Sequence, residues 1–469
     1  SAFLIANNNF ITYTGSQSNL SRQTVSSKRP ENNKGILMRN SILIALISLS
    51  LGGLIGAKVM ESFGRNYIMA NLPVPSGTLN DKDVFLKSIP ANSELVKKDL
   101  VEVNKKAKNV ILLIGDGMSA SQITSYRLLK EGPNGRIAMD RFPISGIVLT
   151  HSADAIITDS ASSATAYSTG SKTKNSYLGV DKDGQILENL TEKLDDFGFI
   201  SALISTSEVT HATPAAFSSH VDSRRDTDEI SSQMLESKVA TILGGGRNFF
   251  LPPEKGGKRK DKRNLLEEAK KSHKILTHKN QLVISNINPS EKILGLFANE
   301  HLRDEGTPDN HPSEPTLTEM LKFSLERAKA AIDNQCRGSF IMVEGSQVDW
   351  AGHANNIDYL ERELGEFDEA TRYALDYAKN NQNTLVVVTA DHETGGLLIE
   401  PIALSYYTGN NIKFSFNTAI GGGSHTGAPV PVYAYGPGSM NFSGTLDNTD
   451  VHHAILNALD LTEQTGSCL

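Results

Sequence analysis

A three-layer α/β/α fold with a largely parallel central sheet is predicted by two features of the sequence. Short apolar runs rich in Val and Ile alternate with amphipathic segments, and most of the runs are apolar at every position. A strand that is apolar on both faces belongs in the middle of a sheet covered on both sides. Alternation with helices favours parallel strands joined by crossovers. The predicted strands are 110–114, 146–150, 200–205, 239–243, 340–343, 385–389 and 430–435.

Two helices are predicted from capping and periodicity. Thr316 followed by Glu319 is a capping-box signature, and apolar residues at helical spacing continue after it. A second helix, between residues 357 and 378, carries its apolar residues on one stripe and charges on the opposite side. Helices of this kind cover a sheet with their apolar face.

Composition narrows the class of protein. The 469 residues include 46 basic and 53 acidic side chains, a formal charge of −7, and 39% are hydrophobic. A disordered chain, a collagen and a polytopic membrane protein are excluded, and no positive field favours nucleic acid. Two cysteines, Cys336 and Cys468, allow at most one disulfide, and the terminus at Cys468 is expected to be frayed. A disulfide scaffold is therefore excluded.

The N-terminal part indicates export. Residues 41–57 form an uncharged apolar run that follows Arg39 and ends in small residues, the pattern of a signal peptide. Translation is expected to start at Met38, and the alternative is a retained N-terminal anchor. We therefore expect a periplasmic or secreted protein without membrane association once the signal is removed.

The domain organisation follows from these patterns, with one interruption of the strand–helix rhythm. The basic run 252–263 is expected to be an exposed loop, with a lid or a partner contact as the alternative. The predicted parts are an upstream segment (1–37), a signal peptide or anchor (38–57), a linker and N-terminal arm (58–108), and a catalytic domain (109–469) with an insertion at about 246–315.

Polar residues that could carry chemistry follow the apolar runs. Asp116 lies between two glycines directly after a predicted strand. Ser160 precedes a stretch that can open a helix, where unpaired N–H groups would favour attack on a phosphate; alternatively Asp159 or Ser160 only caps that helix. The guanidinium of Arg224 suits a tetrahedral oxyanion, although a surface ion pair is the alternative.

Six side chains with nitrogen or oxygen ligand atoms, Asp116 among them, indicate metal ions. Asp349 and His353 are four residues apart and would share one helix face. With them, Asp116, Asp391, His392 and His425 make six ligands without thiolates, as suits two catalytic zinc ions. Glu344 and Thr213, sharing the Asp116 carboxylate, would make a hard oxygen site for Mg²⁺.

Six motifs, taken together and in this order, resemble the alkaline phosphatase family over residues 110–436. They are GDGMS, TDSASSATA, HATPAAFSSHVDSR, VEGSQVDWAGHANN, TADHETGG and GSHTGAPVPVYAYG. The resemblance implies the family's α/β/α sandwich, usually a homodimer, that hydrolyses small phosphate monoesters without binding nucleic acid. It further implies that Ser160 becomes phosphorylated and that Arg224 holds the phosphate.

The resemblance also assigns the metal ligands. It implies one zinc ion on Asp349, His353 and His425, a second on Asp116, Asp391 and His392, and magnesium on Asp116, Thr213 and Glu344. Two positions near the substrate depart from the best-known bacterial pattern, because His211 stands where many members have Asp and Trp350 where they have Lys. These replacements leave the third metal's identity open, and loss of the Lys is expected to weaken phosphate holding.

Three alternatives remain at this stage. A sulfatase of the same superfamily would need a Cys/Ser-x-Pro-x-Arg segment, and none surrounds Ser160. A phosphodiesterase could use the same metals. An inactive metal-stabilised binding protein would be expected to lack a ligand or the nucleophile, yet each matching position is filled.

Overall fold

The computed structural model describes residues 105–283, 288, 290–305, 313–401, 411–418 and 424–469, together with strand β1 (Lys82–Phe85). All of them belong to Pro73–Leu469, one of the two units into which the chain divides. The predictions for residues 1–57 lie outside the described residues. Within the described ranges, no helix has both the length and the apolar character that crossing a membrane requires.

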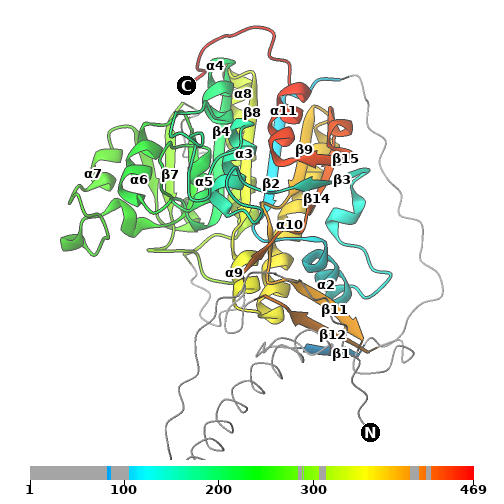
Figure 1. Ribbon diagram of the computed structural model, residues 1–469. Helices are drawn as coiled ribbons and strands as arrows, with labels where there is room; N and C mark the ends of the chain where they lie inside the picture. The colour runs from blue at the N-terminus through cyan, green and yellow to red at the C-terminus, as the bar shows by residue number, and fades with distance from the viewer. Residues whose placement is uncertain are drawn as a thin grey trace, which may run out of the picture. The chain divides into compact units, whose positions relative to one another are not determined.

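A ten-stranded sheet forms the centre of the fold, in the order β15-β3-β14-β9-β2-β8-β4-β5-β7-β6 (Figure 1). Its strands are β2 (Asn109–Gly115), β3 (Ile144–Leu149), β4 (Phe199–Glu208), β5 (Thr241–Gly245), β6 (His273–Leu276), β7 (Lys292–Leu296), β8 (Gly338–Gly345), β9 (Thr384–Thr389), β14 (Val430–Tyr435) and β15 (Gly444–Asp447). Strand β14 is antiparallel to both of its neighbours, and the other pairs are parallel. The predicted largely parallel sheet is therefore confirmed.

Helices cover the sheet on both sides, which confirms the three-layer prediction. One group, α2, α8, α9 and α10, packs together against β2, β8 and β9, and another, α3, α4, α5 and α11, packs together around α3. The capping box at Thr316 and the long buried stripe of α10 are both present. The helices are α2 (Ala120–Lys130), α3 (Ser160–Thr169), α4 (Leu190–Asp196), α5 (Ala212–Ala216), α6 (Thr227–Glu236), α7 (Leu265–Ala269), α8 (Leu317–Asn334), α9 (Gln347–His353), α10 (Ile357–Asn380) and α11 (Asn448–Ala458).

Four parallel neighbours, β9, β2, β8 and β4, bring distant parts of the chain to one edge of the sheet. In the ladder Ile114 faces Glu344 on one side and Thr389 on the other, and Ser205 also faces Glu344. These pairs lie at the carboxyl ends of the strands, where ligands gather in open α/β sheets. Residues that follow these strands therefore meet at this edge.

Two small antiparallel sheets form in addition to the main sheet. Strands β10 (Glu393–Thr394) and β13 (His425–Thr426) pair antiparallel, with Thr394 opposite His425. Strands β1, β12 (Asn411–Phe416) and β11 (Leu397–Pro401) form an antiparallel sheet. The segment expected to be an N-terminal arm thus contributes β1 to this second sheet.

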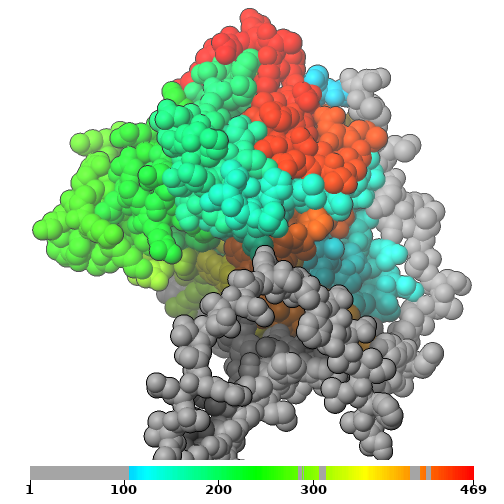
Figure 2. All heavy atoms as spheres, in the orientation of Figure 1, coloured from blue at the N-terminus to red at the C-terminus, as the bar shows by residue number. Residues whose placement is uncertain are grey.

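The expected insertion at about 246–315 is in part integral to the sheet. It supplies β6 and β7, which extend the sheet beyond β5, and its green residues lie at one side of the molecule in Figures 1 and 2. Most of the basic loop is exposed, as expected, but the Arg259 side chain is fully buried. Its guanidinium donates to Asp261, to Ser231 Oγ and to the Phe249 carbonyl, which anchors the loop to the fold.

The C-terminus is not frayed as expected, because Cys336 and Cys468 form a disulfide with a Cα–Cα distance of 5.1 Å. The Arg337 guanidinium also donates to the Glu463 carbonyl at 2.7 Å. Cys336 lies just before β8, an eight-residue strand that ends beyond Glu344. At about 3.3 Å per residue the disulfide is roughly 25 Å from that end of the strand.

Replacing both cysteines by serine is expected to lower the free energy of unfolding by about 3–5 kcal/mol, because the bond closes 132 positions of chain. Thermal denaturation of the variant and of the parent, with and without reductant, measures this loss. Turnover at 25 °C should be unchanged because the bond is far from the carboxyl ends of the strands. A variant as stable as the oxidised parent would show that the bond contributes nothing.

Candidate active site and metal centre

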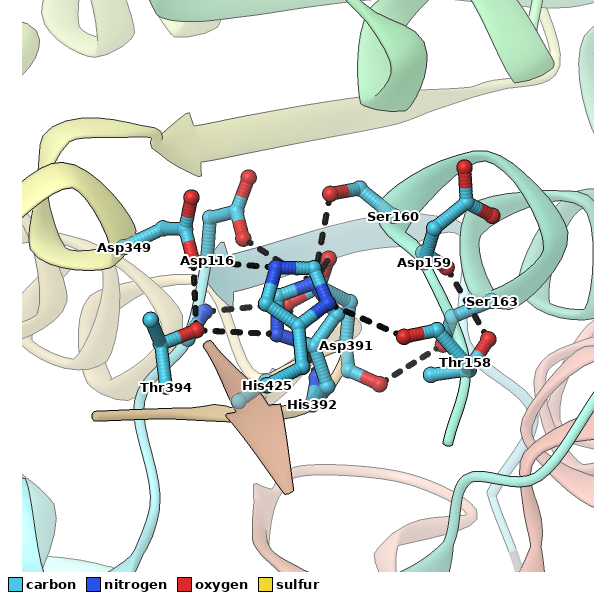
Figure 3. A network of polar contacts seen from close by, with 12 residues as sticks. Asp116, Thr158, Asp159, Ser160, Ser163, Asp349, Asp391, His392, Thr394 and His425 are labelled. Atoms are coloured by element: carbon cyan, nitrogen blue, oxygen red, sulfur yellow. Dashed lines mark hydrogen bonds and ion pairs between the residues drawn. The ribbon is translucent and has the colours of Figure 1, made fainter. Parts of the chain in front are cut away.

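Ser160 is the first residue of α3, and its hydroxyl is directed into a cluster of acidic and imidazole side chains (Figure 3). Asp159 caps the helix by accepting from the Ser162 N–H at 3.0 Å, so the capping role falls to Asp159 and leaves Ser160 for other contacts. Ser160 is 2% exposed, and its Oγ lies 3.2 Å from Nε2 of His392. The free N–H groups of the first helical turn favour negative charge at this position.

The first cluster of possible ligands combines Asp116, Asp391 and His392. One ligand atom of each lies within 4.8 Å of the others. Nε2 of His392 is 3.1 Å from Oδ2 of Asp391 and 3.5 Å from Oδ1 of Asp116. All three side chains are fully buried. The family resemblance assigned the same three residues to one zinc ion.

The second cluster combines Asp349, His353 and His425. Nε2 of His353 is 3.3 Å from Asp349 and 3.2 Å from Nε2 of His425, and His425 is 3.5 Å from Asp349. The predicted set of Asp349, His353 and His425 therefore does converge. His392 also falls within 4.8 Å of Asp349 and His425, so it lies between the two clusters.

The third cluster contains Asp116, Glu344 and His211, whose ligand atoms again lie within 4.8 Å of one another. The Thr213 hydroxyl is fully buried and lies against Glu344. The predicted oxygen site of Asp116, Thr213 and Glu344 is thus brought together. His211, which the sequence placed only near the substrate, adds a nitrogen to it.

The hydrogen bonding of the carboxylates in these clusters indicates that they suit cations. Both oxygens of Asp116, Oδ2 of Asp391 and Oε1 of Glu344 are buried and accept no hydrogen bond among the described residues. Burial, together with repulsion from neighbouring carboxylates, raises the pKa of Asp116 well above its usual value. Burial likewise raises the pKa of Asp391 to about 6 and of Glu344 to about 7. Bound cations would remove the cost of these buried charges.

Arg224 is held on both branches of its guanidinium. Nη1 donates to Asp159 at 3.1 Å, and Nη2 lies 3.1 Å from Nε2 of His211. Burial, reinforced by the Arg224 charge, lowers the pKa of His211 to about 3, so the imidazole is neutral and accepts this hydrogen bond. Although burial opposes it, Arg224 and backbone N–H donors hold the pKa of Asp159 below its usual value. The guanidinium is therefore a fixed cation on the α3 side of the site.

Several supporting residues were missed in the sequence. Thr394 donates to Asp349 and lies 3.2 Å from Nδ1 of His392, while the Thr158 carbonyl lies 2.9 Å from Nδ1 of His425 (Figure 3). Gly117, already noted beside Asp116 in the sequence, has φ +73°, and a Cβ there would be 2.8 Å from the Asp349 backbone. The position of Thr394, two residues after His392, was a usable signal, since such residues share a strand face.

Trp350 and two histidines form an aromatic group beside the third cluster. The ring centroids of Trp350 and His211 are 6.0 Å apart at 89°, and those of Trp350 and His301 are 4.2 Å apart at 60°. His301 was not singled out in the sequence, because it lies in no motif and in no apolar pattern.

A buried hydroxyl at a helix N-terminus lies beside three clusters that could hold cations and beside a fixed guanidinium. Such a hydroxyl can attack a tetrahedral oxyanion ester when bound cations neutralise the charge. The fold and the site thus define a metal-dependent phosphate ester hydrolase.

The alkaline phosphatase family model matches residues 107–412 and 403–461. Alkaline phosphatase 4 of Bacillus subtilis is 33% identical over 454 residues, which cover 80% of this chain and 95% of that protein. The structure of alkaline phosphatase from the Antarctic bacterium TAB5 is similar with a TM-score of 0.67 and 37% identity, covering 76% of this chain and 98% of that one. The chain belongs to the alkaline phosphatase family and is a phosphoric monoester hydrolase.

The structure of a variant of the TAB5 enzyme is also similar. In that structure a histidine is replaced by aspartate and magnesium is bound in the site called M3; it matches with a TM-score of 0.65 and 35% identity.

Proposed function

We propose that this protein hydrolyses phosphate monoesters through a phosphoserine formed on Ser160. The observation that carries the proposal is the 3.2 Å approach of Ser160 Oγ to His392, the side chain that lies between two candidate metal clusters. A serine hydroxyl is a weak nucleophile at neutral pH unless a base or a metal activates it. The position of Ser160 beside both clusters supports activation by metal.

We further propose two zinc ions and one magnesium ion for each chain. Asp349, His353 and His425 would hold one zinc, and Asp116, Asp391 and His392 the other. Asp116, Glu344 and Thr213 would hold magnesium. Because the adjacent His211 nitrogen could also be a ligand, a different metal ion is the alternative at this site. When bound, such ions lower the pKa of an attacking hydroxyl and stabilise the oxygen that departs.

The chain's own residues orient the substrate in this proposal. Asp159 and His211 each occupy one N–H of Arg224, so the remaining N–H groups of the guanidinium would be available to the phosphoryl oxygens. The N-terminus of α3 adds unpaired N–H groups on the same side. In this proposal Ser160 would attack the phosphorus atom while these donors offset the negative charge on the phosphoryl oxygens.

Self-association into a homodimer is also proposed. Ile147 and Leu149 of β3, with Ile156 and Ile157 of the following loop, are between 41% and 79% exposed. Clustered exposed apolar side chains of this kind support a contact with a second copy of the chain. Sedimentation of the purified protein distinguishes a dimer from a monomer.

Export to the periplasm or the medium is proposed as well. The disulfide between Cys336 and Cys468 supports it, because such bonds persist mainly in oxidising compartments. Sequencing the N-terminus of protein recovered outside the cytoplasm tests both export and signal removal.

Metal analysis combined with nitrophenyl phosphate turnover tests the central proposal. We expect zinc and magnesium in a two-to-one ratio, near-complete loss of turnover after chelation, and recovery when both metals are restored. Turnover of the monoester should exceed that of the bis-nitrophenyl diester. Full activity in chelated protein would refute the metal mechanism, and faster diester cleavage would reveal a phosphodiesterase.

A further inference from the structure

We propose that His301 is a positioning residue: it fixes the Trp350 indole against His211 and thereby holds Arg224 in place for phosphate. The inference rests on the proposed function of the site and adds a residue outside every motif of the sequence. Four contacts in series carry it, from the end of β4 to the guanidinium.

The first contact fixes His301 itself. The Glu208 N–H donates to Nδ1 of His301 at 3.2 Å, and the Glu208 carboxylate lies against the same nitrogen. Glu208 is the last residue of β4, a central strand of the main sheet. The imidazole therefore has its orientation set by the sheet rather than by its own loop.

The second contact passes this orientation to Trp350. The ring centroids of Trp350 and His301 are 4.2 Å apart, closer than those of Trp350 and His211. His301 also lines a cavity of about 350 Å³ together with Arg247 and His278. Loss of the imidazole would remove this packing contact and leave space beside the indole.

The last two contacts reach the phosphate-binding group. The Trp350 ring packs edge-on against His211, whose Nε2 accepts from Arg224. A displaced indole would free the His211 ring to rotate and break that hydrogen bond. Arg224 would then be held only by Asp159, so the guanidinium would be less well ordered for a phosphoryl group.

Fluorescence tests the contact without relying on activity, because Trp350 is the only tryptophan in the chain. Excitation of the purified metal-loaded protein at a wavelength that tyrosine does not absorb therefore reports the indole alone. We expect His301→Ala to move the emission to longer wavelength and to lower its anisotropy. His301→Phe, which keeps a ring against the indole, should restore both signals.

Enzyme kinetics test whether loss of the ring contact weakens phosphate binding. In His301→Ala we expect the inhibition constant of inorganic phosphate, and KM for nitrophenyl phosphate, to rise about three- to tenfold, with kcat little changed. His278→Ala is the matched control, since this histidine lines the same cavity and should alter neither signal. Zinc content and melting temperature of each variant confirm that fold and metals are intact.

The outcomes separate this inference from the proposed function. An active parent whose His301→Ala variant shows unchanged fluorescence and unchanged phosphate inhibition overturns the positioning role alone. A lower melting temperature without any change in phosphate inhibition would show a merely structural role and would also overturn it. A parent without phosphomonoesterase activity would instead overturn the proposed function, while the fluorescence result would still judge the ring contact.

Discussion

Ser160→Ala is expected to reduce kcat for nitrophenyl phosphate by about three orders of magnitude or more, as removal of a nucleophile does in other hydrolases. The hydroxyl is buried and lies within 3.2 Å of His392 in the middle of the clusters, where a neighbouring group could not easily replace it. Acid quenching with labelled substrate should trap phosphoprotein in the parent and none in the variant. Zinc content should be the same in both.

Ser168→Ala is the matched control for this experiment. Ser168 is a buried serine of the same helix, and its hydroxyl donates only within the helix, to the Thr165 carbonyl at 3.2 Å. Its replacement should leave turnover and phosphoprotein formation close to those of the parent. Parent-like turnover in Ser160→Ala would show that another group attacks phosphorus.

Asp116→Asn is expected to remove more metal than any change at a single cluster, because Asp116 belongs to two of the three clusters. We expect this variant to lose both the ion shared with Asp391 and the ion shared with Glu344, and about two orders of magnitude or more of activity. Glu344→Gln, which belongs to one cluster, should lose one ion only. Equal metal contents in the two variants would contradict the shared role of Asp116.

The stabilisation by these ions should depend on pH in a definite direction. In the metal-free protein the pKa values of Asp391 and Glu344 are raised to about 6 and about 7, whereas unfolded carboxyl groups titrate near 4. Between these values the folded chain binds more protons than the unfolded chain, so its stability falls as pH rises. Metal-bound carboxylates stay ionised and escape this loss.

The difference in melting temperature between metal-loaded and chelated protein should therefore grow from pH 5 to pH 8. His211 and His392 do not disturb this difference, because burial lowers the pKa of both and keeps them neutral with or without ions. A difference that is constant over this range would show that these carboxylates do not exchange protons for metal.

The sequence predicted the residues of the candidate site better than it predicted the structure around them. Asp116, Glu344 and Asp391 could be placed together because each lies at the carboxyl end of a strand with a strong apolar signal, and such ends share one edge. The cap at Asp159 and the one-turn spacing of Asp349 and His353 were equally local. Local patterns of this kind can be predicted because they do not depend on contacts with distant parts of the chain.

The features that the sequence did not predict depend on long-range contacts, which no local pattern encodes. Strand β6 carries a weak apolar signal because it lies at one end of the sheet, and half of it is only partly buried. Strand β7 is a short buried apolar run that was not among the predicted strands. The bond between Cys336 and Cys468 joins positions that only the completed fold brings together. His301 owes its importance to Trp350, a residue far along the chain, and neither one indicates the other in the sequence.

The pairing of β10 with β13 has a consequence for how such enzymes can be re-engineered. It sets His425 opposite Thr394, although the chain leaves the site after β10 and returns only at β13. The segment between the two strands is more than a loop, because it carries β11 and β12, and the side chains of Leu397, Phe414 and Phe416 are buried in the hydrophobic core. A redesign of this segment would therefore have to keep these three side chains as well as the four paired residues of β10 and β13.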